Sequence, residues 1–360
     1  MKSYFGTDGL MEIADSWQQL FESLRTPVYS QSPYWFQQYI QYLEKSPQSW
    51  VWFCVYSKEK LIALLPLQER SLKLGGLNVK YLTFSSHSHF GLKSFIFGED
   101  IDSSKVVRSF LKYIRSDRWT FLDLHGVEKP GASYQSIVKQ SAIIYIERDE
   151  RVVDILLIGD MDGYLSSLSK SFRRNLKRVS RKIESKSVEY EFNHQCALVK
   201  EAFSRFLLVE ASGWKGLNGT RSAIGLHKNL TQFYHSLVSA LRFNDESMVE
   251  INIMKIDGKD AAVQYAICIE KTVFLLKIGY DEFFSSFQPG NLLLLESIHH
   301  FHKRGFEQIH LITDAKWHNS WRPGRIETKR MIIGTSSMFN ILVFNLLKVA
   351  LKVKSLLHRT

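Results

Sequence analysis

The sequence predicts an α/β (α+β) protein of two modules, each a mixed and mostly antiparallel sheet flanked by helices. The chain has 360 residues, which is more than one hydrophobic core usually serves. Hydrophobic residues make up 45% of it, which is enough for a core in each module and argues against disorder. The same order of predicted elements also occurs twice, at an offset of about 190 to 200 residues, as in a duplicated module.

The first copy of this order begins with WVWFCVYSKEKLIALLPLQER, residues 50–70, which is typical of a strand, a tight polar turn and a second strand. A helix is predicted over 103–116, and TFLDLHGV is the strand that follows it. We expect a further strand in ERDERVVDILL, residues 147–157, to close the module. The first module is therefore predicted to span residues 1–155.

The second copy begins with MVEINIMKIDGKDAAVQYAICIEKTVFLLKIGYD, residues 248–281, which predicts three strands joined by two turns. A helix over 291–305 and the strand EQIHLIT follow. The second module is predicted to span 156–336. Residues 337–360 then form an amphipathic basic helix, whose apolar run is too short and too interrupted by lysine to cross a bilayer. We expect this helix to pack against the protein; the alternative is peripheral contact with an anionic membrane.

The net charge of +11 indicates a polyanionic partner: a nucleic acid, an anionic membrane surface or a phosphate-rich cofactor. Much of the charge lies in residues 170–186, KSFRRNLKRVSRKIESK, which carry eight Lys or Arg and one acid. Apolar residues recur there at helical spacing, so the segment predicts a helix with one apolar stripe. Its basic side is either a solvated face or a phosphate-binding face, with Arg173, Arg174, Lys177 and Arg178 nearest its start.

Three scattered cysteines, Cys54, Cys196 and Cys268, indicate reduced core residues rather than a disulfide framework or a zinc site. The first residues, MKSYFGTDGLMEIADSW, lack the uninterrupted apolar region of a signal peptide. We therefore expect a cytoplasmic protein, with attachment to the inner-membrane surface as the alternative. His87 and His89 have the spacing of strand-borne metal ligands, but no acid or cysteine is close to them, so no metal site is expected.

Two stretches of the second module contain candidate site residues. EASGWKGLNGT, residues 210–220, places Glu210, Trp214 and Lys215 among three glycines in a predicted interhelical loop. In GYDEFFSSFQPGNLLLLESI, residues 279–298, Pro289 suits the first turn of a helix. The free N–H groups of Gly290, Asn291 and Leu292 at that helix start would suit a phosphate, although an ordinary helix start explains the same pattern.

These two stretches, together with SFRRNLKRVSRKI and WHNSW, resemble the acyltransferases of the GNAT superfamily that are described as CelD-type or cellulose-biosynthesis-like. Members of this family are similar in turn to the Fem-type aminoacyltransferases of peptidoglycan, which also contain two GNAT-like modules. SPYWFQQYI, residues 32–40, is similar to the family's N-terminal signature. The ordered motifs cover nearly the whole chain.

The resemblance implies acyl transfer from acetyl-CoA or another acyl-CoA to an amine, without a metal, in a catalytic second module. The first module lacks an equivalent of the loop at Pro289 and Gly290, so we expect it to bind no cofactor. The pyrophosphate of the donor would lie on the helix start from Gln288 to Leu292, including Gly290 and Asn291. The family's loop is richer in glycine, whereas this sequence offers only Gly290 there.

The resemblance also implies roles around the acceptor. Glu210, Asp281 and His318 are the candidates for deprotonating the amine, and His318 stands where relatives have a lysine. Lys215 would hold an anionic group, and Trp214 would stack on a sugar ring or on the donor. The remaining candidates for substrate binding are Arg173, Arg174, Tyr280 and Trp321.

Three functions remain open from the sequence. The first is an N-acyltransferase whose acceptor is a small-molecule or saccharide amine, such as an amino sugar or a precursor of envelope polysaccharide. The second is a Fem-like transferase that takes its acyl group from aminoacyl-tRNA, which the basic helix favours. The third is a non-catalytic scaffold of polysaccharide synthesis that lies on the membrane through the C-terminal helix.

Overall fold

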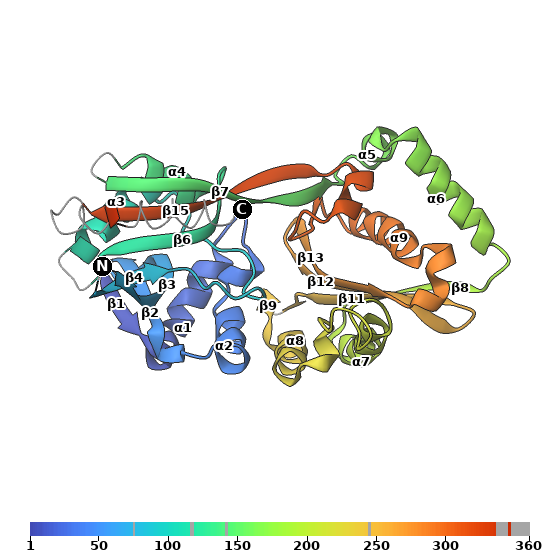
Figure 1. The fold of residues 1–360 in the computed structure, drawn as a ribbon, viewed down its shortest axis with the longest axis horizontal. Helices are drawn as coiled ribbons and strands as arrows, with labels where there is room; N and C mark the ends of the chain where they lie inside the picture. Colours follow the sequence, from blue (N-terminus) through green and yellow to red (C-terminus); the bar gives the residue numbers. More distant parts are fainter. Residues whose placement is uncertain (75, 116–118, 141–142, 244–245, 336–344, 347–360) are drawn as a thin grey trace. The chain divides into compact units, whose positions relative to one another are not determined.

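A computed structural model describes residues 1–74, 76–115, 119–140, 143–243, 246–335 and 345–346 (Figure 1). They divide into two compact units, each made of segments that are distant in the sequence. The first unit comprises Met1–Arg25, Lys45–Arg151 and the described residues from Ile326 on. The second comprises Thr26–Glu44 and Val152–Arg325. Within the described residues, no helix combines the length and the apolar character needed to cross a bilayer.

The first unit is a mixed sheet with helices packed on it. Adjacent strands are antiparallel, except that β4 and β6 are parallel. The strands, in spatial order, are β1 (Lys2–Phe5), β2 (Trp50–Ser57), β3 (Lys60–Leu74), β4 (Leu77–Thr83), β6 (Phe121–Glu128) and β15 (Gly324–Thr335), while the short β5 (Ile96–Phe97) pairs with β3. The helices are α1 (Gly6–Glu22), α3 (Ser103–Arg115) and α4 (Ala132–Val138).

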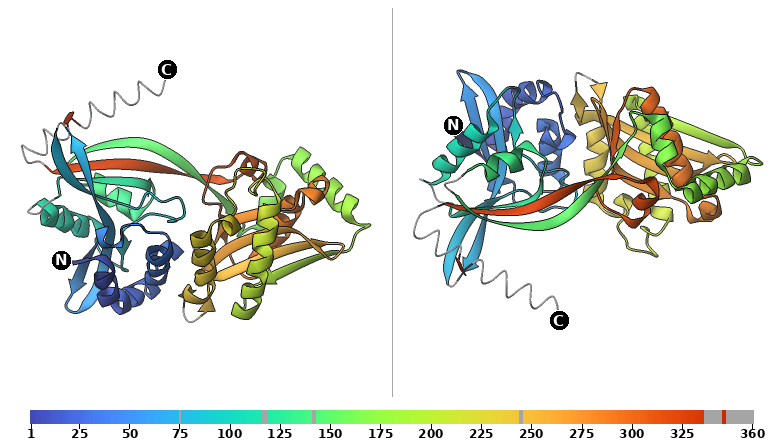
Figure 2. Two further views of the ribbon diagram at one scale, coloured as in Figure 1. Left: turned by 60° about the horizontal axis from the view of Figure 1, so that its bottom comes forward. Right: turned by 90° about the horizontal axis from the view of Figure 1, so that it is seen from above.

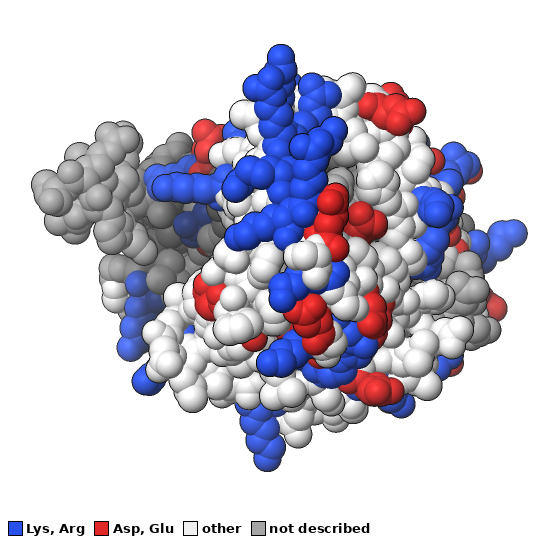
Figure 3. Space-filling view, turned by 90° about the vertical axis from the view of Figure 1, so that its right-hand side faces the viewer, with Lys and Arg blue, Asp and Glu red and all other residues white. Residues whose placement is uncertain are grey.

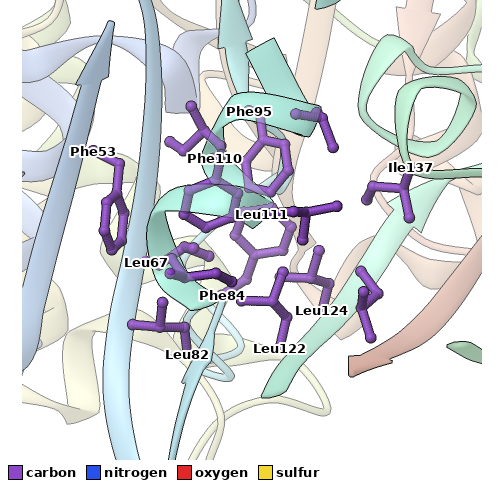
Figure 4. Packing of buried hydrophobic residues seen from close by; sticks show 14 of the residues in the cluster. Phe53, Leu67, Leu82, Phe84, Phe95, Phe110, Leu111, Leu122, Leu124 and Ile137 are labelled. Carbon is purple, nitrogen blue, oxygen red and sulfur yellow. The ribbon is translucent and has the colours of Figure 1, made fainter. Parts of the chain in front are cut away.

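The apolar run of β2 is explained by burial on both of its faces. Phe53 belongs to the core between the sheet and α3, where it lies against Phe110 (Figure 4). Trp52, its neighbour in sequence, points to the other face and packs on Trp17 of α1. Its indole N–H donates to the carbonyl of Gly6. A strand covered on both faces needs apolar residues at every position, which is why this segment does not alternate.

The second unit carries the other sheet. Its strands, in spatial order, are β7 (Ile143–Leu157), which enters this unit at Val152, β14 (Gln308–His310), β13 (Thr272–Tyr280), β12 (Lys259–Ile269), β11 (Val249–Ile256) and β8 (Val188–Asn193). Its helices are α2 (Pro33–Tyr42), α5 (Met161–Ser167), α6 (Lys170–Ile183), α7 (Cys196–Ser212), α8 (Lys228–Ala240) and α9 (Pro289–Lys303). Only β13 and β14 are parallel among the pairs of this sheet that involve β8 and β11 to β14.

Helices cover both faces of this second sheet. Figures 1 and 2 show α6 and α9 over one face and α7 and α8 over the other. Alternate residues of β12 follow this division: Tyr265 packs on Phe206 of α7, whereas Gln264 accepts a hydrogen bond from Ser297 of α9. The mixed α/β fold predicted from the sequence is confirmed, as are the strand–turn–strand segments and the helices predicted over 103–116, 170–186 and 291–305, within a few residues at their ends.

The two units differ from the consecutive modules 1–155 and 156–336 that the sequence predicted. Residues 26–44 belong to the second unit, because Tyr29 packs on Phe274 and Trp35 on Phe233, with ring centroids 4.9 and 5.1 Å apart. The residues from Ile326 belong to the first unit, because β15 pairs with β6. The predicted helix over 337–360 lies outside the described residues, apart from Asn345 and Leu346.

The place of α2 gives a first prediction. Replacing the buried Trp35 by alanine should lower the free energy of unfolding by about 3–5 kcal/mol, as for other large aromatic residues removed from a core. Hydrogen exchange measured by mass spectrometry should become faster in α8 and β13 and stay unchanged in β2 and β3. The matched change Gln38→Ala on the same helix should have little effect. Faster exchange confined to β2 and β3 would contradict the assignment of α2 to the second unit.

Candidate active site

A pocket of about 430 Å³ lies where β13 ends and α9 begins. β13 and β14 pair from Thr272 to Phe274, and because β14 ends at His310, the rest of β13 has no neighbour on that side among the described strands. The described residues that line the pocket come from the loop after α7, from β12 and β13, and from the region of α9; they are Trp214, Val263, Gln264, Ile278, Gly279, Tyr280, Ser285, Gln288, Pro289, Gly290, Asn291, Leu293, Leu294 and Trp317.

The start of α9 forms the rim of this pocket. Gln288 has a left-handed backbone, with φ of 47°, and Pro289 occupies the first turn. The carbonyl of Gln288 accepts hydrogen bonds from the N–H groups of Asn291 and Leu292. Of the three N–H groups predicted to be free, only that of Gly290 therefore has no partner among the described residues. Leu292 is buried in the core and does not line the pocket, so its predicted contact with the cofactor does not fit its position.

Gly290 leaves space at this rim. An added Cβ would meet only the Tyr280 ring, at an ordinary 3.8 Å, so the packing of the fold does not require glycine. A free backbone N–H without a side chain at the positive end of a helix is suited to a close anion. The side chains of Gln288 and Asn291 are joined by a hydrogen bond of 3.2 Å and flank the same N–H. The structure thus brings three of the four predicted cofactor residues together.

Helix α6 is attached to this rim through Asn175, which the sequence did not single out, and through Arg178 of its basic side. Asn175 donates to Gln288, and Arg178 donates to Asn175, each at 2.9 Å. Arg173 and Arg174 are exposed, have no partner among the described residues and do not line the pocket. A helix-spacing pattern could identify the basic face, but it could not show which of its residues meets the loop before α9.

Glu210 and Lys215 hold the glycine-rich loop in place. Glu210 is buried at the end of α7; one carboxylate oxygen accepts from Lys215 at 3.0 Å and the other from the backbone N–H of Ile224 at 2.8 Å. Lys215 also donates to the carbonyl of Ile278. Both groups are fully engaged, so the predicted roles of Glu210 as the base and of Lys215 as an anion-binding residue do not fit the geometry. Between them, Trp214 is 55% exposed and lines the pocket, in agreement with its predicted position.

Two glycines permit the close contact between α7 and β13. A Cβ on Gly279 would lie 2.8 Å from the Cα of Glu210, and a Cβ on Gly213 would lie 2.8 Å from the carbonyl oxygen of Tyr280. Real Cβ atoms do not approach other atoms so closely, so both positions need glycine for packing. The glycines therefore serve to seat the loop on β13.

The other predicted bases are also engaged in structure. Asp281 caps the short helix Glu282–Phe287 by accepting from the N–H of Phe283, and it does not line the pocket. His318 is buried, and its Nδ1 is paired with Asp154 at 2.8 Å. Burial lowers the pKa of His318, although the Asp154 carboxylate opposes this shift. His318 thus anchors the turn Lys316–Trp321 from within the fold.

The aromatic residues near the pocket divide in the same way. Trp317 precedes His318, packs on its ring and lines the pocket, although the sequence analysis gave it no role. Trp321 is fully buried against Phe172, so its predicted contact with substrate does not fit its position. Tyr280 lines the pocket as predicted, and burial, together with nearby Glu282, raises the pKa of its phenol.

A further titratable group lies on β13. Burial and the charge of Lys215 lower the pKa of Lys277 to about 8, against the attraction of Glu210. Its ammonium group lies 5.7 Å from the centre of the Tyr234 ring. No group of three His, Cys, Asp or Glu side chains that could hold a metal ion occurs within the described ranges.

The lowered pKa of Lys277 predicts a stability change with pH. The unfolded chain binds the extra proton up to its ordinary pKa near 10.5, so between about pH 8 and 10.5 the unfolded state is the more protonated one and stability rises with pH. At pH 7 the partly buried ammonium group destabilises the folded state, so Lys277→Met should raise the free energy of unfolding. The gain should be about 1–2 kcal/mol, because partial exposure of Lys277 reduces the full effect of its pKa shift. Near pH 10.5 the folded protein already contains a neutral Lys277, so the gain in stability should vanish there. Urea titrations at both pH values measure it, and a pH-independent difference would contradict this explanation.

Comparisons with known proteins agree with this architecture. Residues 170–319 match the family model of the acetyltransferase (GNAT) domain. No relative was found among curated proteins. A structure of FemX is similar with a TM-score of 0.58 and 10% identity, covering 96% of this chain and 99% of that one.

Two further structures are similar at the level of the fold. The C-terminal domain of a putative lysylphosphatidylglycerol synthetase from Agrobacterium fabrum has a TM-score of 0.54 and 10% identity, covering 93% of this chain and 95% of that one. A conserved protein of unknown function from Bacteroides thetaiotaomicron has a TM-score of 0.55 and 14% identity, covering 90% and 97%. Residues 170–319, which include every described residue that lines the pocket, are thus the part of the chain that is similar to a GNAT acetyltransferase domain.

Proposed function

We propose that this protein is an N-acyltransferase that moves an acyl group from acetyl-CoA or another acyl-CoA to an amine in the pocket of the second unit. The observation that carries the proposal is the position of the free Gly290 N–H, which lies at the rim of a pocket inside the GNAT domain. The N–H of Gly290 and the side chains of Gln288 and Asn291 would bind the donor's pyrophosphate at the positive end of α9. The loop before α9 contains one glycine, Gly290, whereas the corresponding loop of the family is richer in glycine, so we propose a single backbone donor for the pyrophosphate.

The chemistry needs little from the protein besides position. The donor supplies an activated thioester; attack by an amine forms a C–N bond and breaks the C–S bond. The phenol of Tyr280 is protonated through the neutral range, as any tyrosine is at its ordinary pKa, and burial with nearby Glu282 raises that pKa further; it can therefore protonate the departing sulfur. Since Glu210, Asp281 and His318 are engaged elsewhere, we propose that the acceptor enters as the neutral amine and releases its proton to solvent.

For the acceptor we propose a saccharide or other small-molecule amine. Trp214 presents an exposed aromatic face at the pocket, which suits stacking against a sugar ring. The resemblance to CelD-type proteins supports an amino sugar or an envelope polysaccharide precursor. Both assignments are proposals, as are a cytoplasmic location and peripheral contact with an anionic membrane through residues 337–360.

A second candidate donor is aminoacyl-tRNA, and the surface of α6 favours it. Figure 3 shows the basic side chains as a ridge that projects from the second unit. Exposed cations of this helix without any partner among the described residues are Lys170, Arg173, Arg174, Lys177 and Arg181. Such a row could neutralise successive phosphates of a polynucleotide.

The CoA proposal predicts that Gly290→Ala weakens acetyl-CoA binding at least tenfold, because a methyl group would stand between the ligand and the Gly290 N–H, which has no partner among the described residues. Stability should be unchanged, since the new Cβ meets only Tyr280 at 3.8 Å. Isothermal titration calorimetry measures the affinity. Gly225→Ala is the matched control, because its Cβ also makes only ordinary contacts and Gly225 does not line the pocket. Equal affinity of the two variants would count against the proposal.

The α6 surface gives a separate prediction. Replacing Arg173 and Arg174 by alanine should weaken tRNA binding about tenfold and lower the salt dependence, the slope of log K against log salt, by about two. The control is Lys200→Ala with Lys228→Ala, two exposed cations on α7 and α8. A gel shift at several salt concentrations measures both quantities. If the arginine variant and the control behave alike, the α6 surface is only solvated; if no tRNA is bound at low salt, the second candidate fails.

A further inference from the structure

Three buried polar side chains meet beneath the pocket. They come from three elements: Asn252 from β11, Gln264 from β12 and Ser297 from α9, and each is at most 2% exposed. The Ser297 hydroxyl donates to Oε1 of Gln264 at 2.8 Å. The Asn252 amide donates to the same oxygen at 3.5 Å and to the Ser297 oxygen at 3.4 Å. Polar groups in such a place are expensive unless they are bonded, so their presence calls for an explanation.

The network leaves one hydrogen-bond donor for the pocket. Oε1 of Gln264 takes both bonds from its neighbours, which fixes the side-chain amide plane. Nε2 of Gln264 has no partner among the described residues, and Gln264 is one of the residues that line the pocket. Because Oε1 is already bonded and the amide cannot rotate freely, the Nε2 donor can be satisfied only by an acceptor atom of a ligand or solvent molecule in the pocket.

The surroundings of Gln264 define what that acceptor can be. The nearby lining residues Val263, Ile278, Leu293 and Leu294 are apolar, and no described residue that lines the pocket carries a charged side chain. A carboxylate or phosphate would be desolvated there without a counter-charge, which is unfavourable. A plain alkyl chain would leave the Nε2 donor unpaired. The acceptor is therefore an uncharged oxygen, as in an amide or a hydroxyl.

The depth of Gln264 limits where this oxygen lies along the ligand. Gln264 bonds Ser297, which lies seven residues after Gly290 on α9, about 10 Å along the helix at 1.5 Å per residue. A phosphate on the Gly290 N–H would thus be followed, within about 10 Å of chain, by the oxygen that faces Gln264. A phosphate joined to a narrow, branched and uncharged chain with a hydroxyl and an amide has this composition; the pantetheine arm of CoA is such a chain, whereas a polynucleotide end is not.

We infer that Gln264, fixed by Ser297 and Asn252, is a specificity residue that donates to an uncharged oxygen of the donor's carrier arm, and so selects a pantetheine-type donor over a plain alkyl or nucleotide one. The inference rests on the proposed function for the position of the donor's phosphate at Gly290. The orientation of the Gln264 donor rests on its bonds with Ser297 and Asn252. It assigns Gln264 a role in binding, not in the transfer step itself.

The test compares Gln264→Met with the wild-type protein by calorimetry, using three probes: CoA, free pantetheine, and adenosine 3′-phosphate 5′-diphosphate, the nucleotide half of CoA. Loss of one neutral hydrogen bond should lower the affinity for CoA and the affinity for pantetheine by the same factor, about three- to tenfold. The nucleotide half should bind equally well to both proteins. Gln195→Met, at an exposed position without a side-chain hydrogen bond, is the matched control and should bind all three probes as the wild type does.

Gln264→Glu is the second variant, in case the methionine disturbs the fold. It has the same shape and keeps an oxygen for Ser297 and Asn252, but it places a second oxygen where Nε2 was, so pantetheine should again bind more weakly. Thermal unfolding checks that each variant is folded.

The outcomes separate this inference from the proposed function. If CoA binds to the wild type and to both Gln264 variants with equal affinity, the inference is overturned while the CoA proposal stands. If pantetheine is weakened by the Gln264 changes but the nucleotide half does not bind at all, the inference stands and the phosphate site at Gly290 fails. Absence of binding by both pantetheine and CoA overturns both.

Discussion

The candidate site depends on the close contact of α7 with β13. The end of the helix lies directly on the strand because Gly279 and Gly213 have no side chains where the two backbones meet. The Glu210 carboxylate then accepts hydrogen bonds from Lys215 and from the N–H of Ile224, at either end of the loop. Lys215 also donates to the carbonyl of Ile278 on β13. A buried ion pair with additional hydrogen bonds is costly to break, because removing one partner leaves the other charge uncompensated. This contact places Trp214 at the pocket and holds in position the end of β13 that lines the pocket, Ile278 to Tyr280.

The residues with the most obvious chemistry therefore build the site without touching its ligand. Glu210, Lys215, Asp281 and His318 each have a structural partner, whereas the described residues that line the pocket are uncharged. Such a site suits a reaction in which both reactants are already activated and the protein supplies position, a free backbone N–H and exclusion of water. Transfer from a thioester to a neutral amine is a reaction of this kind.

The sequence predicted the fold and the place of the site better than the roles of individual residues. Hairpin patterns and helix starts are local, so the β11–β12–β13 meander and the start of α9 could be predicted from Asp257, Pro289 and their neighbours. The place of α2 could not, because it depends on Trp35 meeting Phe233 across about two hundred residues of chain. Likewise, a carboxylate in a glycine-rich loop has the same sequence pattern whether it faces substrate or, like Glu210, bonds its own backbone. The role proposed for Gln264 could not be predicted from the sequence, because the orientation of its side chain depends on Ser297 and Asn252, which lie on other elements.

The proposed roles of the pocket residues all depend on an acyl-CoA donor that binds between β13 and α9. Hydrogen exchange of the whole protein, measured by mass spectrometry with and without saturating acetyl-CoA, can locate this donor without assuming an acceptor. We expect slower exchange in peptides that cover residues 278–294 and the loop around Trp214, with no change in β2 and β3 of the first unit. Protection elsewhere, or none at any concentration that saturates binding, would contradict it.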